Sequence, residues 1–214
     1  MKKQLLILLS LSLFFGLLAN DNLKGFGPVR FGLNKQVALE KLSERYNLKK
    51  TSPTFYTTPQ STLPEFLRMS IMVDQAYITI KNFSIDDNPF TVRLHFAKTK
   101  EGGFYGYSIK SSEKDIISYL ENRKYADLLA DIFESKFGKP AKVFDYPDIF
   151  KIKDEVVTEY KSWAIKGFDI YVGVSYKFKY FIQADVFKSA QREVEQRMIR
   201  RDYLQRVNRA ATSF

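Results

Sequence analysis

A twenty-residue stretch near the C-terminus, FDIYVGVSYKFKYFIQADVF at 168–187, alternates between two kinds of side chain over most of its length. Successive side chains of a β-strand point to opposite faces, so a period of two predicts a long hairpin or bent strand pair. The even positions from Ile170 to Val186 are all apolar or aromatic and predict a buried face. The odd positions include Lys177, Lys179 and Asp185, a mixed face that is compatible with water.

The apolar face of this stretch could turn towards lipid or towards a protein core. A transmembrane barrel needs at least about 8 strands of ~9–11 residues each. Only this segment has that character unambiguously, and much of the remaining chain is patterned as helix. We therefore expect the face to cover a helix inside an α+β protein.

The first nineteen residues are typical of a secretory signal peptide. Lys2 and Lys3 precede an apolar run from Leu5 to Leu18, and Ala19 supplies a small residue at the expected cleavage position. The run is shorter than the ~20 residues that span a bilayer. We expect cleavage after Ala19, no transmembrane span afterwards, and a location in the periplasm or at the cell surface.

The chain contains no cysteine, which excludes disulfides, cysteine nucleophiles, zinc–thiolate sites and a lipidated cysteine. Its formal net charge is +10, an excess that favours anionic partners. Much of the excess lies in residues 188–214, where Lys188 and six arginines face three acids. Export argues against a genomic nucleic acid as the partner.

The rest of the chain predicts two similar units, each with a helix followed by an antiparallel meander. Asn34 is a good N-cap for the first helix, whereas KKTSPTFYTTPQSTLPEF at 49–66 suggests a long loop or an edge excursion. Ser112 and Asp115 resemble a capping box for a second helix that continues to Phe137. We thus expect an α+β fold: signal peptide 1–19, first unit 20–111, second unit 112–187 and a basic C-terminal helix 188–214.

No residue pattern identifies a catalytic or metal site. The one histidine, His95, lies out of phase with the apolar positions of its strand and is expected to face solvent. The acidic pairs Asp86–Asp87 and Asp145–Asp148 lie in turn-rich contexts where aspartate bonds its own backbone. We expect no catalytic residue, metal or cofactor. A carboxylate-based envelope hydrolase is the enzymatic alternative, favoured if Asp145, Asp148 or Asp86 clusters with a second acid in one deep cleft.

Two basic segments are candidates for binding. Arginine suits carboxylate and phosphate groups because its planar fork makes paired hydrogen bonds. In the hairpin, Lys177 and Lys179 alternate with aromatic residues, although their main role could be solubility. The candidate contact residues are Arg192, Arg197, Arg200, Arg201, Arg206 and Arg209 of the terminal helix, with Lys177 and Lys179 second.

Two short motifs resemble small bacterial envelope modules built from a helix and a meander. VRFGLNKQV at 29–37 leads into a helix, and Phe137-Gly138-Lys139-Pro140 is followed by Trp163 and the long hairpin. Both are similar to motifs of the small lipoproteins of outer-membrane barrel assembly and of β-lactamase inhibitor protein, which has tandem modules. The chain departs from the lipoproteins in lacking a lipidation cysteine. The resemblance implies non-enzymatic protein binding in the envelope.

These observations predict a non-catalytic binding or scaffolding protein of the bacterial cell envelope, which engages a protein or an anionic component. A surface adhesin for polyanions is a further alternative. It predicts binding that weakens steeply with salt, because polyanions release counterions when they bind.

Overall fold

The computed structural model of this protein describes residues 23–58, 68–98, 103–154 and 156–211, with the backbone alone for 207–211. The predicted signal peptide therefore lies outside the described residues. The elements are β1 (Gly25–Phe26), β2 (Val29–Arg30), α2 (Lys35–Tyr46), β3 (Lys49–Ser52), β4 (Phe55–Thr57), β5 (Ser70–Val73), β6 (Tyr77–Ile85), β7 (Asn88–Phe96), β8 (Phe104–Lys110), η2 (Tyr119–Asn122), α3 (Arg123–Phe137), β9 (Lys142–Val143), η3 (Ile149–Lys151), β10 (Thr158–Ile165), β11 (Phe168–Lys177), β12 (Lys179–Lys188) and α4 (Ser189–Ala211).

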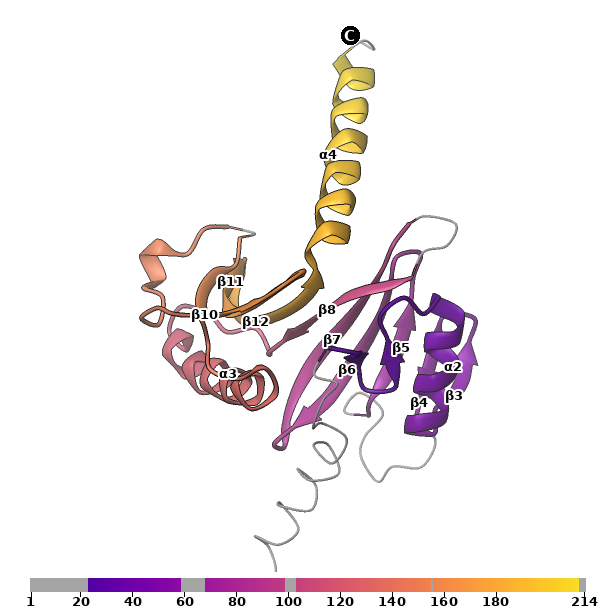
Figure 1. The fold of residues 1–214 in the computed structure, drawn as a ribbon, viewed down its shortest axis with the longest axis horizontal. Helices are drawn as coiled ribbons and strands as arrows, with labels where there is room; N and C mark the ends of the chain where they lie inside the picture. Colours follow the sequence, from indigo (N-terminus) through magenta and orange to yellow (C-terminus); the bar gives the residue numbers. More distant parts are fainter. Residues whose placement is uncertain (1–22, 59–67, 99–102, 155, 212–214) are drawn as a thin grey trace, which may run out of the picture.

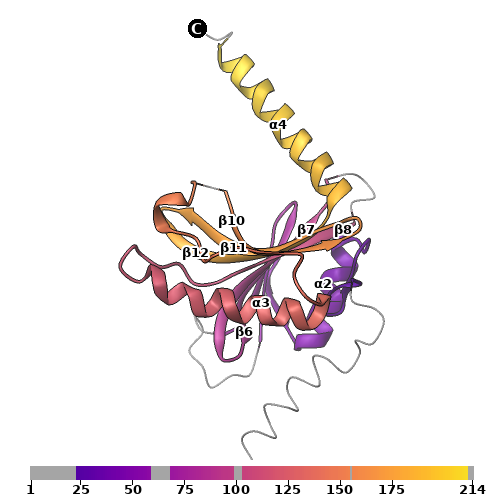
Figure 2. The same cartoon turned by 60° about the vertical axis from the view of Figure 1, so that its left-hand side comes forward.

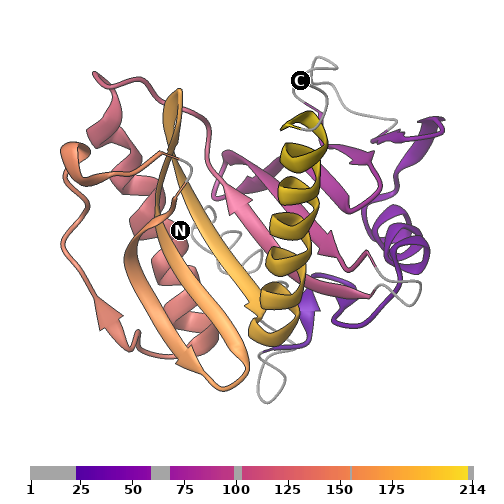
Figure 3. The ribbon, with the colours of Figure 1, turned by 90° about the horizontal axis from the view of Figure 1, so that it is seen from above.

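The described strands form one large antiparallel sheet and a separate small ribbon of β1 and β2 (Figures 1 and 3). The strand order in the large sheet is β3-β4-β5-β6-β7-β8-β12-β11-β10-β9. Two runs of sequential hairpins meet where β8 pairs with β12, with Gly106 opposite Phe187 and Lys110 opposite Gln183. These contacts confirm the predicted α+β class.

Helices α2 and α3 lie on one face of the sheet, and α4 leaves from the other face (Figure 2). The first two helices and the inward side chains of the strands share one hydrophobic core. In α2 the Asn34 side chain accepts a hydrogen bond from Val37 N at 2.9 Å, as the sequence predicts for an N-cap. Burial of Ala38 and Leu42 then fixes the helix on the sheet. We call the opposite sheet face, from which α4 rises, the open face.

The alternating stretch forms the β11–β12 hairpin, and its even face packs on α3. Even-numbered residues such as Ile170, Val172 and Ile182 are at most 2% exposed, which confirms the predicted core face. The prediction that Phe178 is buried is wrong, because this turn residue is 87% exposed at the tip of the hairpin. The odd face is also less solvated than expected, since Asp185 is buried and contacts Arg192 at the start of α4.

The segment predicted as a long loop or an edge excursion forms β3 and β4, which lie exposed or half-exposed at the edge of the sheet, as the second alternative expects; residues 59–67 lie outside the described residues. One local prediction is wrong. The second helix begins at Arg123 instead of near Ser112. Asp115 accepts a hydrogen bond from Ser118 N at 2.9 Å, so it closes a local turn where a helix was expected.

The terminal helix α4 has 23 residues and begins where the sequence predicts. Its first turns contact β12 and β8, and the rest projects away from the sheet (Figures 1 and 2). Within the described chain, no helix combines the length and the hydropathy needed to cross a bilayer.

Candidate interaction surface

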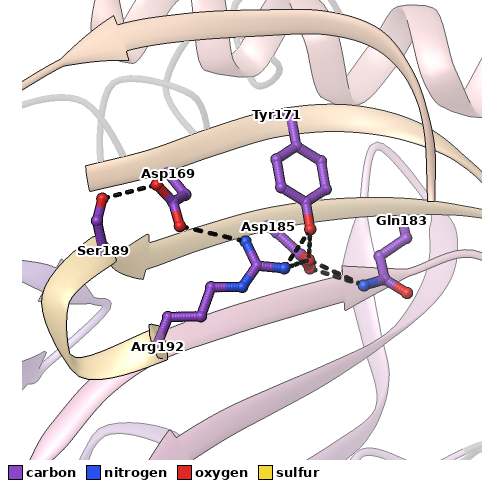
Figure 4. A network of polar contacts seen from close by, with 6 residues as sticks. All are labelled: Asp169, Tyr171, Gln183, Asp185, Ser189 and Arg192. Atoms are coloured by element: carbon purple, nitrogen blue, oxygen red, sulfur yellow. Dashed lines mark hydrogen bonds and ion pairs between the residues drawn. The ribbon is translucent and has the colours of Figure 1, made fainter. Parts of the chain in front are cut away.

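The first turns of α4 are fixed to the open face by a polar network centred on Asp185 (Figure 4). Arg192 Nη2 lies 2.5 Å from the Tyr171 hydroxyl and 3.5 Å from Asp185 Oδ2. The Tyr171 hydroxyl donates to Asp185 Oδ2 at 2.5 Å, and Gln183 Nε2 donates to the same carboxylate at 3.0 Å. These partners contact the carboxylate, and Asp185 is 1% exposed.

A second set of contacts holds the helix start from the other side of Arg192. Ser189 Oγ donates to Asp169 Oδ1 at 2.6 Å, and Arg192 Nη1 lies 3.6 Å from Asp169 Oδ2. The Arg192 guanidinium also stacks over Phe187, with its central carbon 4.6 Å from the ring centroid. One turn later, the buried Glu195 accepts a hydrogen bond from Lys98 N at 3.1 Å. We call Ser189, Arg192 and Glu195 the root of α4.

The charges of the network are complementary, with one guanidinium beside the buried carboxylate. Burial raises the pKa of Tyr171, and the neighbouring Asp185 carboxylate raises it further. Tyr171 therefore stays protonated and donates a hydrogen bond to Asp185. Because the phenol stays neutral, Arg192 supplies the positive charge that the buried carboxylate requires.

Beyond the root, residues 196–206 of α4 form an exposed shaft, with every described side chain open to solvent. Apolar side chains lie among its charges, with Met198 36%, Ile199 51% and Tyr203 64% exposed. The shaft carries four arginines, at 197, 200, 201 and 206, and one acid, Asp202. Arg197 contacts Glu193 at 2.8 Å, but both side chains are largely exposed, so this pair is weak and leaves the arginine accessible.

The structure separates the predicted contact residues into three groups. Arg192 belongs to the root, where its guanidinium contacts Tyr171, Asp169 and Asp185 and its side chain is 23% exposed. Arg197, Arg200, Arg201 and Arg206 lie on the shaft, while for Arg209 only the backbone is described. Lys177 and Lys179 are exposed at the tip of the hairpin, at the far end of β12 from α4. Ten residues of strand separate the two ends, a length of about 33 Å.

The environment of His95 differs from the prediction. It does project from the open face, out of phase with the core, but this face is covered there by aromatic rings. The rings of Tyr77 and Phe187 lie 4.9 and 4.8 Å from the imidazole centroid. Burial lowers the pKa of His95 to about 3, helped by the charges of Arg93, Lys110 and Arg192. His95 is therefore neutral at physiological pH and half-buried.

The acidic pairs lie apart. Asp86 and Asp87 occupy the exposed turn between β6 and β7, both with positive φ. Asp145 and Asp148 line a shallow, open depression together with Glu159, and Asp148 also accepts a hydrogen bond from Phe150 N at 3.1 Å. Among the described residues, no group of three histidine or acidic side chains has an arrangement suited to a metal ion.

Sequence reasoning missed two cations on the open face, Arg93 of β7 and Lys110 of β8. Both alternate with core residues: Val92 and Ile109 are buried, and they are paired across the two strands. The alternation of NPFTVRLHFAK already places Arg93 opposite the core. The alternation does not show which strand lies next to β8 in the sheet. Its neighbour β12 is more than seventy residues away in the sequence.

No protein-family profile, no curated protein and no solved structure matches this chain.

Proposed function

We propose that this chain is a non-catalytic binding protein of the bacterial cell envelope, which holds a protein partner through the shaft of α4. One observation carries the proposal: a helix held at its root by hydrogen bonds and ion pairs extends into solvent with apolar side chains uncovered. Helical stability in proteins comes mainly from packing an amphipathic face, and the described shaft has no such packing within its own chain. A partner that covers the shaft would supply it.

The composition of the shaft favours a protein partner with an acidic surface. Arginine, tyrosine and methionine are enriched at protein interfaces, and arginine and tyrosine are frequent among the residues that dominate affinity. Arg200, Arg201 and Tyr203 combine these properties within one turn and are all exposed. The excess of arginine over acid attracts carboxylates and directs the approach of the partner.

Location in the envelope follows from the predicted signal peptide and from the lack of cysteine. The motifs at 29–37 and 137–140 add the resemblance to small envelope modules. We also propose that the body of the protein contains two similar helix-plus-meander units, 20–111 and 112–187. The order of α2 before β3–β8 and of α3 before β9–β12 supports this division, and so does the junction of the two meanders at β8 and β12.

A site-specific crosslink tests the proposal. A photoreactive phenylalanine at position 203 replaces an exposed tyrosine of the shaft, and irradiation of living cells should trap one defined envelope protein. Reversal of the shaft charges by R197E/R200E/R201E should abolish that crosslinked product, because the arginines no longer attract the partner. The variant keeps the root intact, whereas truncation at Phe187 would expose the buried Asp185.

The matched control is K139E/K142E/K166E, which changes the net charge equally at three exposed lysines outside α4. Its crosslinked product should equal that of the unmodified chain. Equal loss in both triple variants would attribute binding to overall charge and would refute a role for the shaft.

A further inference from the structure

The open face carries two neighbouring cations, Arg93 and Lys110, that form no ion pair within the described residues. Arg93 faces Ser108 across β7 and β8, and Lys110 faces Thr91, so the two cations are diagonal neighbours. Diagonal side chains on one sheet face lie within reach of each other when they are long. The residues between them, such as Val92, point into the core on the opposite face.

Each cation rests on an aromatic ring. The Arg93 guanidinium carbon lies 5.1 Å from the Tyr77 ring centroid, and Lys110 Nζ lies 4.8 Å from that of Phe181. Within the described residues, neither side chain forms an ion pair or a hydrogen bond to an acceptor. The Nε atom of Arg93 is buried without any hydrogen-bond partner.

The charges around the pair do not neutralise it. Burial lowers the pKa of Lys110, and the charge of Arg93 lowers it further, with a smaller contribution from Lys177. Asp185 and Glu113 act in the opposite direction, but Asp185 is already engaged by Arg192, Tyr171 and Gln183. A half-buried charge without a partner is costly, and a bound anion removes that cost.

We propose that Arg93 and Lys110 form a second binding site, which takes a carboxylate presented by a polypeptide. The inference rests on the proposed function, since it assigns an acidic side chain of the protein partner to this place. The guanidinium can bind a carboxylate through two parallel hydrogen bonds, and the ammonium adds a second charge. The half-buried Tyr77 provides apolar surface for the methylene groups of an aspartate or glutamate.

The position of the site fits a partner held by α4. The root residue Arg192 and the two cations lie on the same sheet face, and the shaft rises from that face (Figure 2). The pKa of His95, which lies between the root and Arg93, is lowered by the charges of Arg93, Lys110 and Arg192 together. One acidic partner can therefore contact the shaft and the face at once.

The test uses hexaglutamate as a probe and NMR as the readout. In ¹⁵N-labelled protein, titration should shift the Nε–Hε signal of Arg93 and the backbone signals around Lys110, whereas hexaglutamine should shift neither. R93Q and K110Q should each weaken hexaglutamate binding about tenfold, the effect of losing one charge-assisted contact. The control K41Q removes an exposed lysine from α2 and should leave the affinity unchanged.

Two further experiments distinguish failure of this site from failure of the shaft proposal and test the class of ligand. R197Q/R200Q/R201Q should leave the Arg93 shift in place, so failure of the shaft proposal is distinguishable from failure of this one. Inorganic phosphate should bind more weakly than hexaglutamate; equal or stronger binding would overturn the assignment to polypeptide carboxylates. No shift of the Arg93 signal with hexaglutamate, or equal binding by R93Q, K110Q and wild type, would overturn the site itself.

Discussion

Arg192 Nη2 lies 3.5 Å from Asp185 Oδ2, and this contact connects the first turn of α4 to the buried middle of the sheet. The arginine side chain is 23% exposed and the aspartate side chain 2%. The pair is thus shielded on the aspartate side and partly hydrated on the arginine side. Removal of Arg192 alone should destabilise the fold, because the buried Asp185 carboxylate then lacks its counter-charge.

Replacement of Arg192 by methionine should therefore lower the free energy of unfolding by about 2–3 kcal/mol, somewhat less than for a fully buried pair. Urea unfolding followed by circular dichroism measures the change. R197M, on the shaft, should alter stability by about 0.5 kcal/mol or less, because Arg197 is exposed. In the double variant R192M/D185N the loss should shrink, since the unpaired charge is gone. Equal stability of R192M and R197M would contradict the root as described.

The strands and helices with strong local periodicity could be predicted from the sequence. The β11–β12 hairpin and β7 follow from alternation, and α2 follows from the Asn34 cap. Local signals suffice for these elements because one face of each is buried throughout. The helix predicted from Ser112 failed for the opposite reason: Ile116 and Ile117 are 63% and 90% exposed, so their spacing reflects no packing.

The surface could be predicted only in part. The exposed arginines of the shaft can be predicted from the charge composition of the segment, because their exposure does not depend on contacts with distant residues. The role of Arg192 depends on Tyr171 and Asp185, which reach it only after β11, β12 and α4 have assembled. The proximity of Arg93 and Lys110 likewise depends on the register of β7 and β8, which periodicity alone does not specify.

Acidification should destabilise the protein through His95. The pKa of His95 is about 3 in the folded chain, against the ordinary value of 6.5, so only the unfolded chain takes up this proton between those values. Stability is complete above the unfolded pKa and falls as the pH drops below it. The expected loss between about pH 7.5 and about pH 5 is roughly 2 kcal/mol. Urea unfolding at both pH values measures it.

The variant H95Q isolates this effect, because His95 is the one histidine of the chain. Glutamine can keep a hydrogen bond to Ser108 Oγ, which lies 3.2 Å from the imidazole Nε2, but it does not titrate. Its stability should change little over the same pH interval. A wild-type protein as stable at the lower pH as at the higher would show that His95 is not shielded by Tyr77 and Phe187.

The shaft should exchange its amide hydrogens much faster than the sheet when the protein is alone. Its described side chains are exposed, so little tertiary packing opposes local opening. Hydrogen exchange followed by mass spectrometry should show early labelling of 197–206 and late labelling of β7 and β8. Trypsin should likewise cleave first at Arg197, Arg200 or Arg201 and leave the root attached. Slow exchange along the shaft, equal to that of the sheet, would contradict its projection into solvent.

Phe178 occupies the left-handed region with φ of 63° and is 87% exposed. A large side chain in this conformation is strained, while the ring contributes little packing. F178G should therefore raise the free energy of unfolding by about 1 kcal/mol, because glycine adopts positive φ without strain. The control F150G removes a ring that is 92% exposed from η3, where φ is not positive, and should not stabilise the protein.

If F178G is stabilising, the aromatic residue at the tip lowers the stability of the fold. The tip between Lys177 and Lys179 is then the next place to probe for contact with a partner. If F178G is neutral or destabilising, the strain is relieved by interactions at the tip, and this reason for a functional role of Phe178 disappears.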